Sequence, residues 1–352
     1  MLYKVIGLMS GTSLDGLDIA YCHFLFENNK WTFVIKEAQT IEYNKEIREN
    51  LLRAENTNSE DFVRIDKEFG HFLGEKTKNF IEKHSIEVDF ISSHGQTIFH
   101  QPNILLTTQI GDINAIAAQT GIKTIGDFRR KDVALKGQGA PLVPIGDRFL
   151  FAEYPYCLNL GGFSNISYEE YNKDTENSQR IAYDICPVNI VLNHLANKEG
   201  LDYDKDGALS RLGKSNNELL NKLNEIEFYT LTQKKSLGKE WVKENIFPVL
   251  EDSNLSTKDM MATFVEHITD QLAKNIKGKI LITGGGVYNK YLIERLKHKL
   301  NYQIHIPNEI IINYKEALIF AFLGVLRERK EINVLASVTG AERDSCSGHI
   351  VE

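Results

Sequence analysis

Residues 7–18 read GLMSGTSLDGLD, and this stretch decides the fold of the first part of the chain. On its N-terminal side apolar residues alternate from Tyr3 to Met9, and on its C-terminal side they alternate again from Leu17 to Phe26. Alternation with a period of two predicts half-buried strands, and the glycines between them predict a tight turn. We therefore expect a strand, a glycine turn and a second strand.

The same turn carries groups that suit an anion and a metal ion. Its small residues let the backbone close around phosphate, so that the N–H groups of residues 11–13 can donate to phosphate oxygens. Asp15 and Asp18 could hold Mg²⁺, directly or through water. A plain hairpin turn is the alternative, but such a turn does not need three hydroxyls and two carboxylates within nine positions. The predicted nucleotide-binding residues here are Ser10, Gly11, Thr12, Ser13, Leu14, Asp15, Gly16 and Asp18.

This turn is not a Walker A loop, which has the form Gly-x4-Gly-Lys-Ser/Thr and opens a helix. The segment contains no lysine, and the residues after it alternate like a strand. Phosphate binding by a β-hairpin is instead typical of actin and the hexokinases.

The second half of the chain repeats the pattern. A strand is predicted at Tyr156–Leu160, a turn at Gly161 and Gly162, and another strand at Ser164–Tyr168. A strand at Lys279–Thr283 then leads into a run of three glycines, Gly284, Gly285 and Gly286. Two copies of strand, glycine turn and strand, each followed by helices and strands, predict an internally duplicated α/β protein.

We expect the actin/hexokinase-like (ribonuclease H-like) fold, with two domains and a central cleft. Residues 1–130 with about 330–352 are predicted to form the N-terminal lobe, and residues 131–329 the C-terminal lobe. Only residues 169–179 look like a loose polar loop, so the sequence offers no clear linker between the lobes.

Composition excludes several classes of protein. The 352 residues include 41 basic and 48 acidic ones, a formal net charge of −7 that argues against broad nucleic-acid binding. No apolar run reaches the ~18 residues of a membrane helix. The first strand follows Met1 without a signal-peptide pattern, and the four cysteines, Cys22, Cys157, Cys186 and Cys346, are scattered. We expect a cytoplasmic protein whose cysteines are reduced and bind no structural zinc.

Motifs throughout the chain resemble those of the anhydro-N-acetylmuramic acid kinases, in family order. The Asp-Phe-Arg-Arg and Gly-Gln-Gly-Ala-Pro blocks are long and specific. The matching blocks are SGTSLDGLD (10–18), SHGQT (93–97), GD (111–112), DFRRKDV (127–133), GQGAPLVP (137–144), NLGG (159–162), GGG (284–286), KEA (315–317) and TGA (339–341).

The resemblance implies a reaction with ATP and Mg²⁺. Water attacks C1 of 1,6-anhydro-N-acetylmuramic acid, the anhydro bridge opens, and O6 takes the γ-phosphoryl group of ATP. The products are ADP and N-acetylmuramic acid 6-phosphate, an intermediate in peptidoglycan recycling. Such a reaction needs a base within hydrogen-bond reach of the water. The resemblance also implies a homodimer, with a small amino sugar as substrate.

By this resemblance Asp184 is the catalytic base, since it ends a predicted strand at Arg180–Asp184, where ligands of α/β proteins bind. A helix-capping aspartate is the alternative. Here the chain departs from the family's usual Asp-Thr-Gly-Pro-Gly/Ala-Asn, because residues 184–189 read DICPVN. The larger residues Ile185, Cys186 and Val188 leave the shape of the neighbouring sugar pocket open.

Other residues take roles from the resemblance with alternatives beside them. Glu316 is a second catalytic carboxylate, or an acid that complements the dipole of a helix beginning near Tyr314. Asn159, Gly161 and Gly162 resemble the second phosphate loop, or form a structural turn. The Gly284–Gly286 run resembles the adenosine motif.

The residues predicted to contact the sugar are His94, Gln96, Thr97, Arg129 and Arg130. A lone histidine such as His94 is more often packed or hydrogen-bonded than catalytic. Arg129 and Arg130 could pair with the lactyl carboxylate, or form surface salt bridges or dimer contacts. Residues 234–240, KKSLGKE, depart from the family's Pro-Pro-Lys-Ser and receive no chemical role.

Two alternative functions stay open at this point. A kinase for another amino sugar is compatible with the departures at residues 185–188. A nucleotide-switched ATP-binding protein of the same fold would need neither Asp184 beside a sugar pocket nor the Arg129–Arg130 pair.

Overall fold

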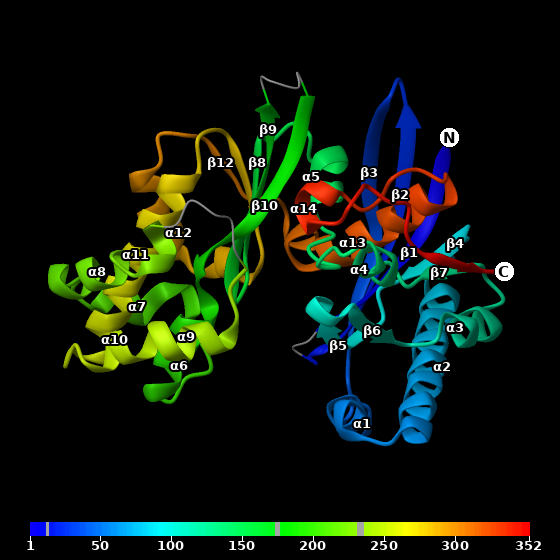
Figure 1. The fold of residues 1–352 in the computed structure, drawn as a ribbon, viewed down its shortest axis with the longest axis horizontal. Coiled ribbons are helices and arrows are strands. Elements are labelled where there is room, and N and C mark those ends of the chain that lie inside the picture. Colours follow the sequence, from blue (N-terminus) through cyan, green and yellow to red (C-terminus); the bar gives the residue numbers. More distant parts are fainter. Residues whose placement is uncertain (12–13, 173–176, 231–235) are drawn as a thin grey trace. The chain divides into compact units, whose positions relative to one another are not determined.

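A computed structural model of the chain describes residues 1–11, 14–172, 177–230 and 236–352. They form two compact units, shown in Figure 1. Unit 1 consists of Met1–Leu150 and Tyr314–Glu352, and unit 2 consists of Phe151–Asn313. The predicted residues Thr12, Ser13, Lys234 and Lys235 lie outside the described residues.

The sheet of unit 1 has the strand order β13-β7-β4-β1-β2-β3. β2 is antiparallel to β1 and β3, whereas β4 is parallel to β1 and β7 is parallel to β4. The strands are β1 (Leu2–Ser10), β2 (Gly16–Glu27), β3 (Lys30–Glu42), β4 (Phe90–Ser93), β7 (Thr124–Gly126) and β13 (His349–Val351), with a separate hairpin of β5 (Gln96–Gln101) and β6 (Leu106–Ile110).

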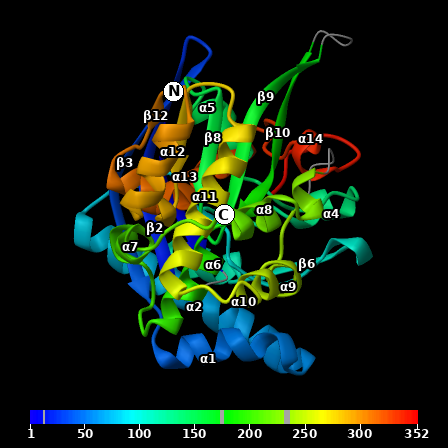
Figure 2. The same ribbon diagram turned by 90° about the vertical axis from the view of Figure 1, so that its left-hand side faces the viewer.

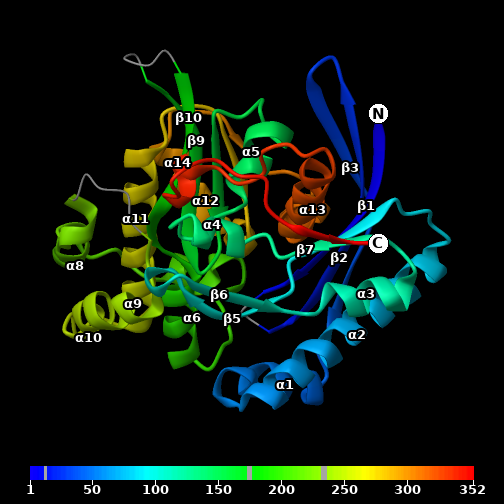
Figure 3. The same ribbon diagram turned by 45° about the vertical axis from the view of Figure 1, so that its right-hand side comes forward.

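Helices cover both faces of this sheet, because successive residues of β1 point to opposite sides. Ile6 and Leu8 join a core with Phe69 and Leu73 of α2. Between them Gly7 meets α13 so closely that a Cβ there would overlap the carbonyl oxygen of Ala317. Figure 3 shows β1 and α13 side by side. The helices of unit 1 are α1 (Lys45–Arg53), α2 (Ser59–His84), α3 (Ile113–Thr120), α4 (Arg130–Ala134), α5 (Pro144–Leu150), most of α13 (Glu309–Glu328) and α14 (Ala336–Thr339), with short 3-10 turns at Ala54–Asn56 and Pro102–Ile104.

Unit 2 contains the same arrangement, with the strand order β10-β9-β8-β11-β12. β9 is antiparallel to β8 and β10, whereas β11 is parallel to β8 and to β12. Figure 2 shows β9 and β10 as a long hairpin. The strands are β8 (Tyr156–Leu160), β9 (Phe163–Asn172), β10 (Asn177–Pro187), β11 (Ile280–Thr283) and β12 (Ile304–His305).

The core of unit 2 forms around α11 (Thr257–Asn275), which buries residues on most of its sides. It packs against β10, α6, α7, α8 and α12. The other helices are α6 (Asn189–Lys198), α7 (Ala208–Leu212), α8 (Asn217–Asn224), α9 (Lys239–Asn245), α10 (Phe247–Glu251) and α12 (Lys290–Lys299), with 3-10 turns at Lys205–Gly207, Glu227–Thr230 and Gly285–Tyr288.

In both units a strand with a glycine turn lies at the centre of the sheet, with an antiparallel pair on one side and parallel strands on the other. When only the strands of the main sheet of each unit are counted in chain order, the order is 3-2-1-4-5 in both, with a further edge strand in unit 1. The chain therefore has the predicted duplicated ribonuclease H-like α/β fold. The cleft concerns the placement of the two units and stays a prediction.

The boundaries of the units differ from the predicted lobes. Residues 131–150 and 314–329 belong to unit 1. The physical reason is the packing of α5 on α13, where a Cβ on Gly146 would meet Ile319 at 2.5 Å. A buried ion pair at 2.7 Å between Lys315 and Asp147 joins the same two helices.

The prediction of a loose polar loop at residues 169–179 is wrong at both ends of this segment. Residues 169–172 continue β9 and residues 177–179 begin β10. Polar residues form strands here because the outer part of a hairpin needs no apolar face. No helix in the described residues is long and apolar enough to cross a membrane.

Candidate active site

The turn between β1 and β2 closes with a hydrogen bond of 3.1 Å from the amide of Leu14 to the carbonyl of Gly11. Leu14 has a φ of 57°, in the left-handed region that non-glycine residues rarely adopt. Strained positions of this kind cluster at ligand sites. The predicted glycine turn is therefore present and carries backbone strain.

Ser10, at the end of β1, joins the turn to the segment after β4. Its buried hydroxyl donates to Gln96 Oε1 at 2.5 Å and lies 2.5 Å from the Tyr43 hydroxyl. Ser10 and Gln96, predicted for nucleotide and for sugar, are thus direct neighbours. Thr97 follows, and its hydroxyl accepts from Gln109 at 3.2 Å.

Asp18 is the third residue of β2 and lies close to other acidic groups of unit 1. Its carboxylate accepts a hydrogen bond of 2.6 Å from the hydroxyl of Thr40. Burial raises the pKa of Asp18, the Thr40 bond opposes that shift, and the charge of Asp15 adds to it. Asp15 itself is exposed.

Glu316 is the second acid near this turn. The surrounding protein partly removes the Glu316 carboxyl from water and so raises its pKa. The positive charge of Arg129 opposes this shift, and the negative charge of Asp18 adds to it. The Glu316 side chain is still in contact with solvent. The helix-dipole alternative is wrong, because α13 begins at Glu309, where Asn308 Oδ1 accepts from the Ile311 amide at 3.1 Å. Dipole effects fade within the first turn, so Glu316 lies beyond them.

His94 holds Arg129 in place. Arg129 Nε donates to His94 Nε2 at 3.0 Å, so His94 Nδ1 carries the proton and donates to the Gly95 carbonyl at 2.8 Å. Burial and then the Arg129 charge lower the pKa of His94 to about 3. Arg129 NH1 also donates to Gly139 O at 2.7 Å, and burial lowers its pKa to about 10. With both ring nitrogens engaged, His94 is a hydrogen-bonded residue.

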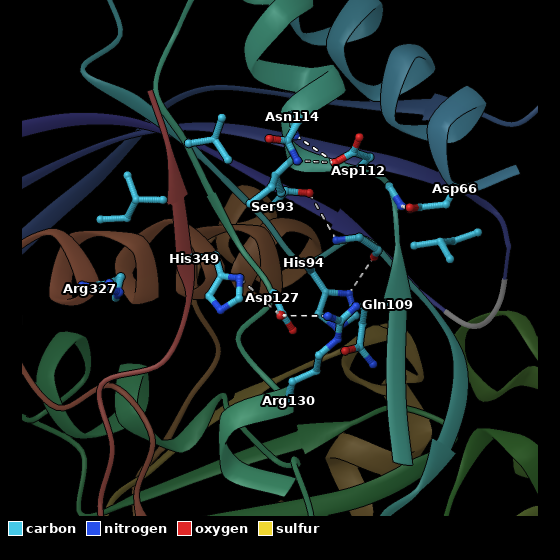
Figure 4. A pocket seen from close by; sticks show the side chains of 16 residues that line it. Asp66, Ser93, His94, Gln109, Asp112, Asn114, Asp127, Arg130, Arg327 and His349 are labelled. Carbon is cyan, nitrogen blue, oxygen red and sulfur yellow. Dashed lines mark hydrogen bonds and ion pairs between the residues drawn. The ribbon is translucent and has the colours of Figure 1, made fainter. Parts of the chain in front are cut away.

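Unit 1 contains a cavity of about 610 Å³ near the carboxyl ends of β4 and β7 (Figure 4). Of the five predicted sugar contacts, His94 and Arg130 line it, and the other three, all described, do not. Arg130 lies 3.6 Å from Asp127, as in the surface salt-bridge alternative. The structure therefore does not bring Arg129 and Arg130 to this cavity as a pair.

In unit 2, Asp184 lies in one row with two asparagines across three strands. Asn165 of β9 is opposite Asp184 of β10 and also opposite Asn159 of β8. Asn165 Nδ2 donates to Asp184 Oδ1, and Asn159 Nδ2 lies 3.4 Å from Asn165 Oδ1. Burial raises the pKa of Asp184, against the effect of its hydrogen bonds. Asn165 and its role were not predicted, although it stands three residues after the predicted loop.

The helix-cap alternative for Asp184 is wrong. Asp184 lies inside β10, and α6 begins five residues later at Asn189 with Val188 as its N-cap. A β-bulge between Asp184 and Cys186 leaves Ile185 unopposed. Bulges of this kind re-aim side chains near active sites.

The three residues that depart from the family pattern belong to the core. Ile185, Cys186 and Val188 are 3%, 0% and 0% exposed and join the hydrophobic cluster of unit 2. Cys186 packs beside Ser164, whose hydroxyl donates to the Cys186 carbonyl at 2.9 Å, and burial raises the pKa of its thiol to about 12. The substitutions therefore change core packing, and their side chains do not face solvent.

The two glycine segments of unit 2 are neighbours. Gly284 has a φ of 85°, and a Cβ there would lie 2.5 Å from Asn159 Oδ1 and 2.8 Å from Leu160 O. In the other turn the Gly161 amide donates to Phe163 O, and the carbonyls of Gly161 and Gly162 accept amides at the start of α6. This turn therefore has a structural role, because it holds the start of α6. The Gly161 N–H is engaged in a hydrogen bond within the protein.

Two sheets of order 3-2-1-4-5, each with a glycine turn after its first strand, define the class of actin/hexokinase-like nucleotide-binding proteins. The family model described as anhydro-N-acetylmuramic acid kinase matches residues 3–352. The chain belongs to this family.

Relatives named anhydro-N-acetylmuramic acid kinase cover nearly all of it. That of Aliivibrio fischeri is 36% identical over 370 residues, with 99% of this chain and 98% of the relative covered. That of Mannheimia succiniciproducens is 36% identical over 375 residues, covering 98% of both. Among solved structures, that of Plasmodium falciparum glycerol kinase with ADP matches with a TM-score of 0.46 and 9% sequence identity. The match covers 92% of this chain and 90% of the glycerol kinase chain.

Proposed function

We propose that the chain is an ATP-dependent kinase that opens 1,6-anhydro-N-acetylmuramic acid with water and phosphorylates O6. The products are ADP and N-acetylmuramic acid 6-phosphate, and the sugar phosphate is an intermediate in peptidoglycan recycling. Family membership supports the proposal. The observation that carries it in this chain is the carboxylate of Asp184, half-buried in one row with Asn159, which precedes the second glycine turn.

In this mechanism Asp184 takes a proton from the water as its oxygen bonds to C1. The bond between C1 and O6 breaks, and O6 bonds to the γ-phosphorus of ATP while the bond to ADP breaks. A pKa raised by burial brings Asp184 closer to the pH at which a base works best. Glu316, also with a raised pKa, is the second candidate for a catalytic carboxylate in this proposal.

We place the nucleotide phosphates at the two glycine turns. Ser10, Gly11, Thr12, Ser13, Leu14 and Gly16 would act from unit 1, and Asn159, Gly161, Gly162, Gly284, Gly285 and Gly286 from unit 2. The left-handed backbone at Leu14 and the close approach at Gly284 support these positions. Since the Gly161 N–H is engaged, the Gly162 N–H is the donor we expect at the second turn.

Mg²⁺ fits beside Asp18 and Asp15. No group of three or more potential metal ligands is present in the described part of the chain. Magnesium does not need one, because it usually binds one or two carboxylates with water and phosphate oxygens. Asp18, oriented by Thr40, would hold the ion, with exposed Asp15 acting directly or through water. The bound ion would neutralise phosphate charge.

The sugar would meet Gln96, Thr97 and Arg129, with Arg130 at the edge of the cavity of unit 1. Arg129 suits the lactyl carboxylate, because a guanidinium binds carboxylates with two parallel hydrogen bonds. His94, the fifth predicted contact, would act by holding Arg129.

A homodimer and a cytoplasmic location complete the proposal. The family resemblance supports the dimer, which light scattering of the purified protein would test. Use of ATP and four free cysteines support a reducing compartment, which cell fractionation would test.

The decisive experiment measures ADP formation from ATP and Mg²⁺ in separate reactions. One contains anhydro-N-acetylmuramic acid, one contains no sugar, and two contain N-acetylmuramic acid or N-acetylglucosamine instead. Strict dependence on the anhydro sugar, with N-acetylmuramic acid 6-phosphate found by mass spectrometry, is the expected result. Turnover without sugar would favour a nucleotide-switched binding protein. Preference for another sugar would favour a different kinase.

A further inference from the structure

The carboxylate of Asp184 is held by two donors from outside its own strand. Asn165 Nδ2 donates to Oδ1, and the backbone N–H of Leu237 donates to Oδ2 at 2.7 Å. Each oxygen therefore has a donor of its own. Both torsions that could turn the carboxylate are restrained by these two bonds.

The chemistry of the groups fixes the direction of the Asn165 amide. An ionised carboxylate only accepts hydrogen bonds, so the NH₂ group of Asn165 faces Asp184. Its oxygen then faces Asn159 Nδ2 at 3.4 Å. Asn159 Oδ1 in turn lies against Gly284. A line of amides thus joins the base to both glycine segments of unit 2.

Asn165 contributes nothing to the core that would explain its position. Ser164 and Ile166 on either side are buried at 0% and 1%, whereas Asn165 is exposed. This alternation is that of a strand with one face in the core. A change at Asn165 is therefore expected to leave the packing of unit 2 intact.

Leu237 belongs to residues 234–240, the block that received no chemical role from the sequence. Its amide reaches Asp184 from just before α9, which begins at Lys239. A backbone N–H is present whatever the side chain, except in proline. This explains how the block can depart from the family pattern and still supply the donor.

We propose that Asn165 and the backbone N–H of Leu237 are positioning groups for Asp184, which fix the orientation in which its carboxylate meets the attacking water. The inference rests on the proposed function, since it gives Asp184 the role of base. Both donors favour the ionised carboxylate, because hydrogen bonds to a charged form stabilise it. Losing either donor makes Asp184 take up a proton at a higher pH.

Two variants and two matched controls test this. Asn165→Ala removes the amide donor, and Leu237→Pro removes the N–H. Asn221→Ala, an exposed asparagine of α8, and Leu237→Ala, which keeps the N–H, are the controls. We expect kcat to fall roughly 10–100-fold in both test variants, since small misplacement of a catalytic group costs this much, with KM for ATP within about threefold.

The pH profile separates positioning from general damage. Asp184 must be ionised to act as base, so the acid limb of kcat should move to higher pH in Asn165→Ala and Leu237→Pro and stay in place in both controls. A fall in kcat without this movement would overturn the proposal, as would unchanged kcat in Asn165→Ala. If Leu237→Pro loses its native circular dichroism, Asn165→Ala alone decides.

A second readout does not depend on turnover. In protein labelled with ¹³Cγ-aspartate, the resonance missing from Asp184→Asn identifies Asp184, and its titration gives the pKa directly. The pKa should rise in Asn165→Ala and not in Asn221→Ala, and an unchanged pKa would contradict the proposal. If wild type fails to act on the anhydro sugar while this pKa moves as expected, the proposed function fails and the hydrogen-bonding part of the inference stands.

Discussion

The two sheets place different chemistry on the same row of residues. In unit 1 the row runs through Met9, Asp18 and Thr40, and in unit 2 through Asn159, Asn165 and Asp184. Each row has one acid and one donor from the neighbouring strand. In unit 1 the acid is on the second strand and a hydroxyl on the third donates to it, whereas in unit 2 the acid is on the third strand and an amide on the second donates.

This exchange teaches that the duplication repeated the scaffold and not the function. Asp18 lies near the charged groups Asp15 and Glu316, and Glu316 also interacts with Arg129. Asp184 has amides as its hydrogen-bonding partners. An acid among other charges suits a metal ion and phosphate, and an acid among neutral donors suits proton transfer. We therefore expect the two acids to fail in different ways when changed.

The largest effect is expected for Asp184→Asn. It should lower kcat by roughly 10²–10⁴, the usual contribution of a positioned base, while ATP still binds. Steady-state kinetics with the anhydro sugar and calorimetry with ATP measure the two quantities. Asp252→Asn, at an exposed position of unit 2, is the control and should stay near wild type. Near-normal turnover of Asp184→Asn would remove the distinction between the two acids.

Gly284→Ala tests the close approach of backbone in unit 2. Alanine at a φ of 85°, with its Cβ 2.5 Å from Asn159 Oδ1, should destabilise the protein by about 2–3 kcal/mol. Gly285→Ala is the matched control, since the nearest atom, Asn189 Nδ2, is 4.0 Å away. Urea unfolding measures both. Equal stability of the two variants would mean that the loops are not packed as described.

Each unit also buries one neutral histidine, His94 in unit 1 and His267 in unit 2, with pKa values lowered to about 3 mainly by burial. The unfolded chain takes up these protons below pH ~6.5, and the folded chain does not until about pH 3. The free energy of unfolding should therefore be highest above pH ~6.5. It should fall as the pH drops, by about 2 kcal/mol per histidine at pH 5.

Urea unfolding at pH 7.5 and pH 5.0 measures this loss in wild type, His94→Gln and His267→Gln. Each substitution should reduce the loss between the two pH values by about 2 kcal/mol. A loss that stays the same in one variant would show that the histidine of that unit is protonated in the folded state.

The smallest effect is expected for Asp18→Asn. We expect the Mg²⁺ concentration for half-maximal activity to rise on the order of tenfold, as one charged ligand is lost, with a smaller rise for exposed Asp15→Ala. Titration of activity with Mg²⁺ at saturating sugar measures it. If Asp18→Asn instead abolished turnover at every Mg²⁺ concentration, the two acids would not differ in the way proposed.

The sequence was sufficient for the repeated strands and glycine turns, because alternation and glycine report directly on local backbone. It missed the start of α13 by five residues, since Glu309–Asn313 precedes the segment that matched the family.

The sequence could not predict contacts between distant residues. Leu237 reaches Asp184 across 53 positions, and His94 meets Arg129 across 35. Nor could it predict that Ile185 is the extra residue of a bulge, which depends on the pairing of β9 with β10. For this reason the departures at residues 185–188 suggested an altered pocket, and the structure assigns them to the core.

The most direct test of the account follows the oxygen of the attacking water. The reaction is run in H₂¹⁸O, quenched and reduced at once with borohydride, with unlabelled N-acetylmuramic acid 6-phosphate as a control for exchange at C1. We predict one ¹⁸O on the sugar carbon C1, none in the phosphate group, and labelled product from Asp184→Asn that forms roughly 10²–10⁴ times more slowly than with wild type. Label in inorganic phosphate, or a labelled product from Asp184→Asn at the wild-type rate, would contradict the account.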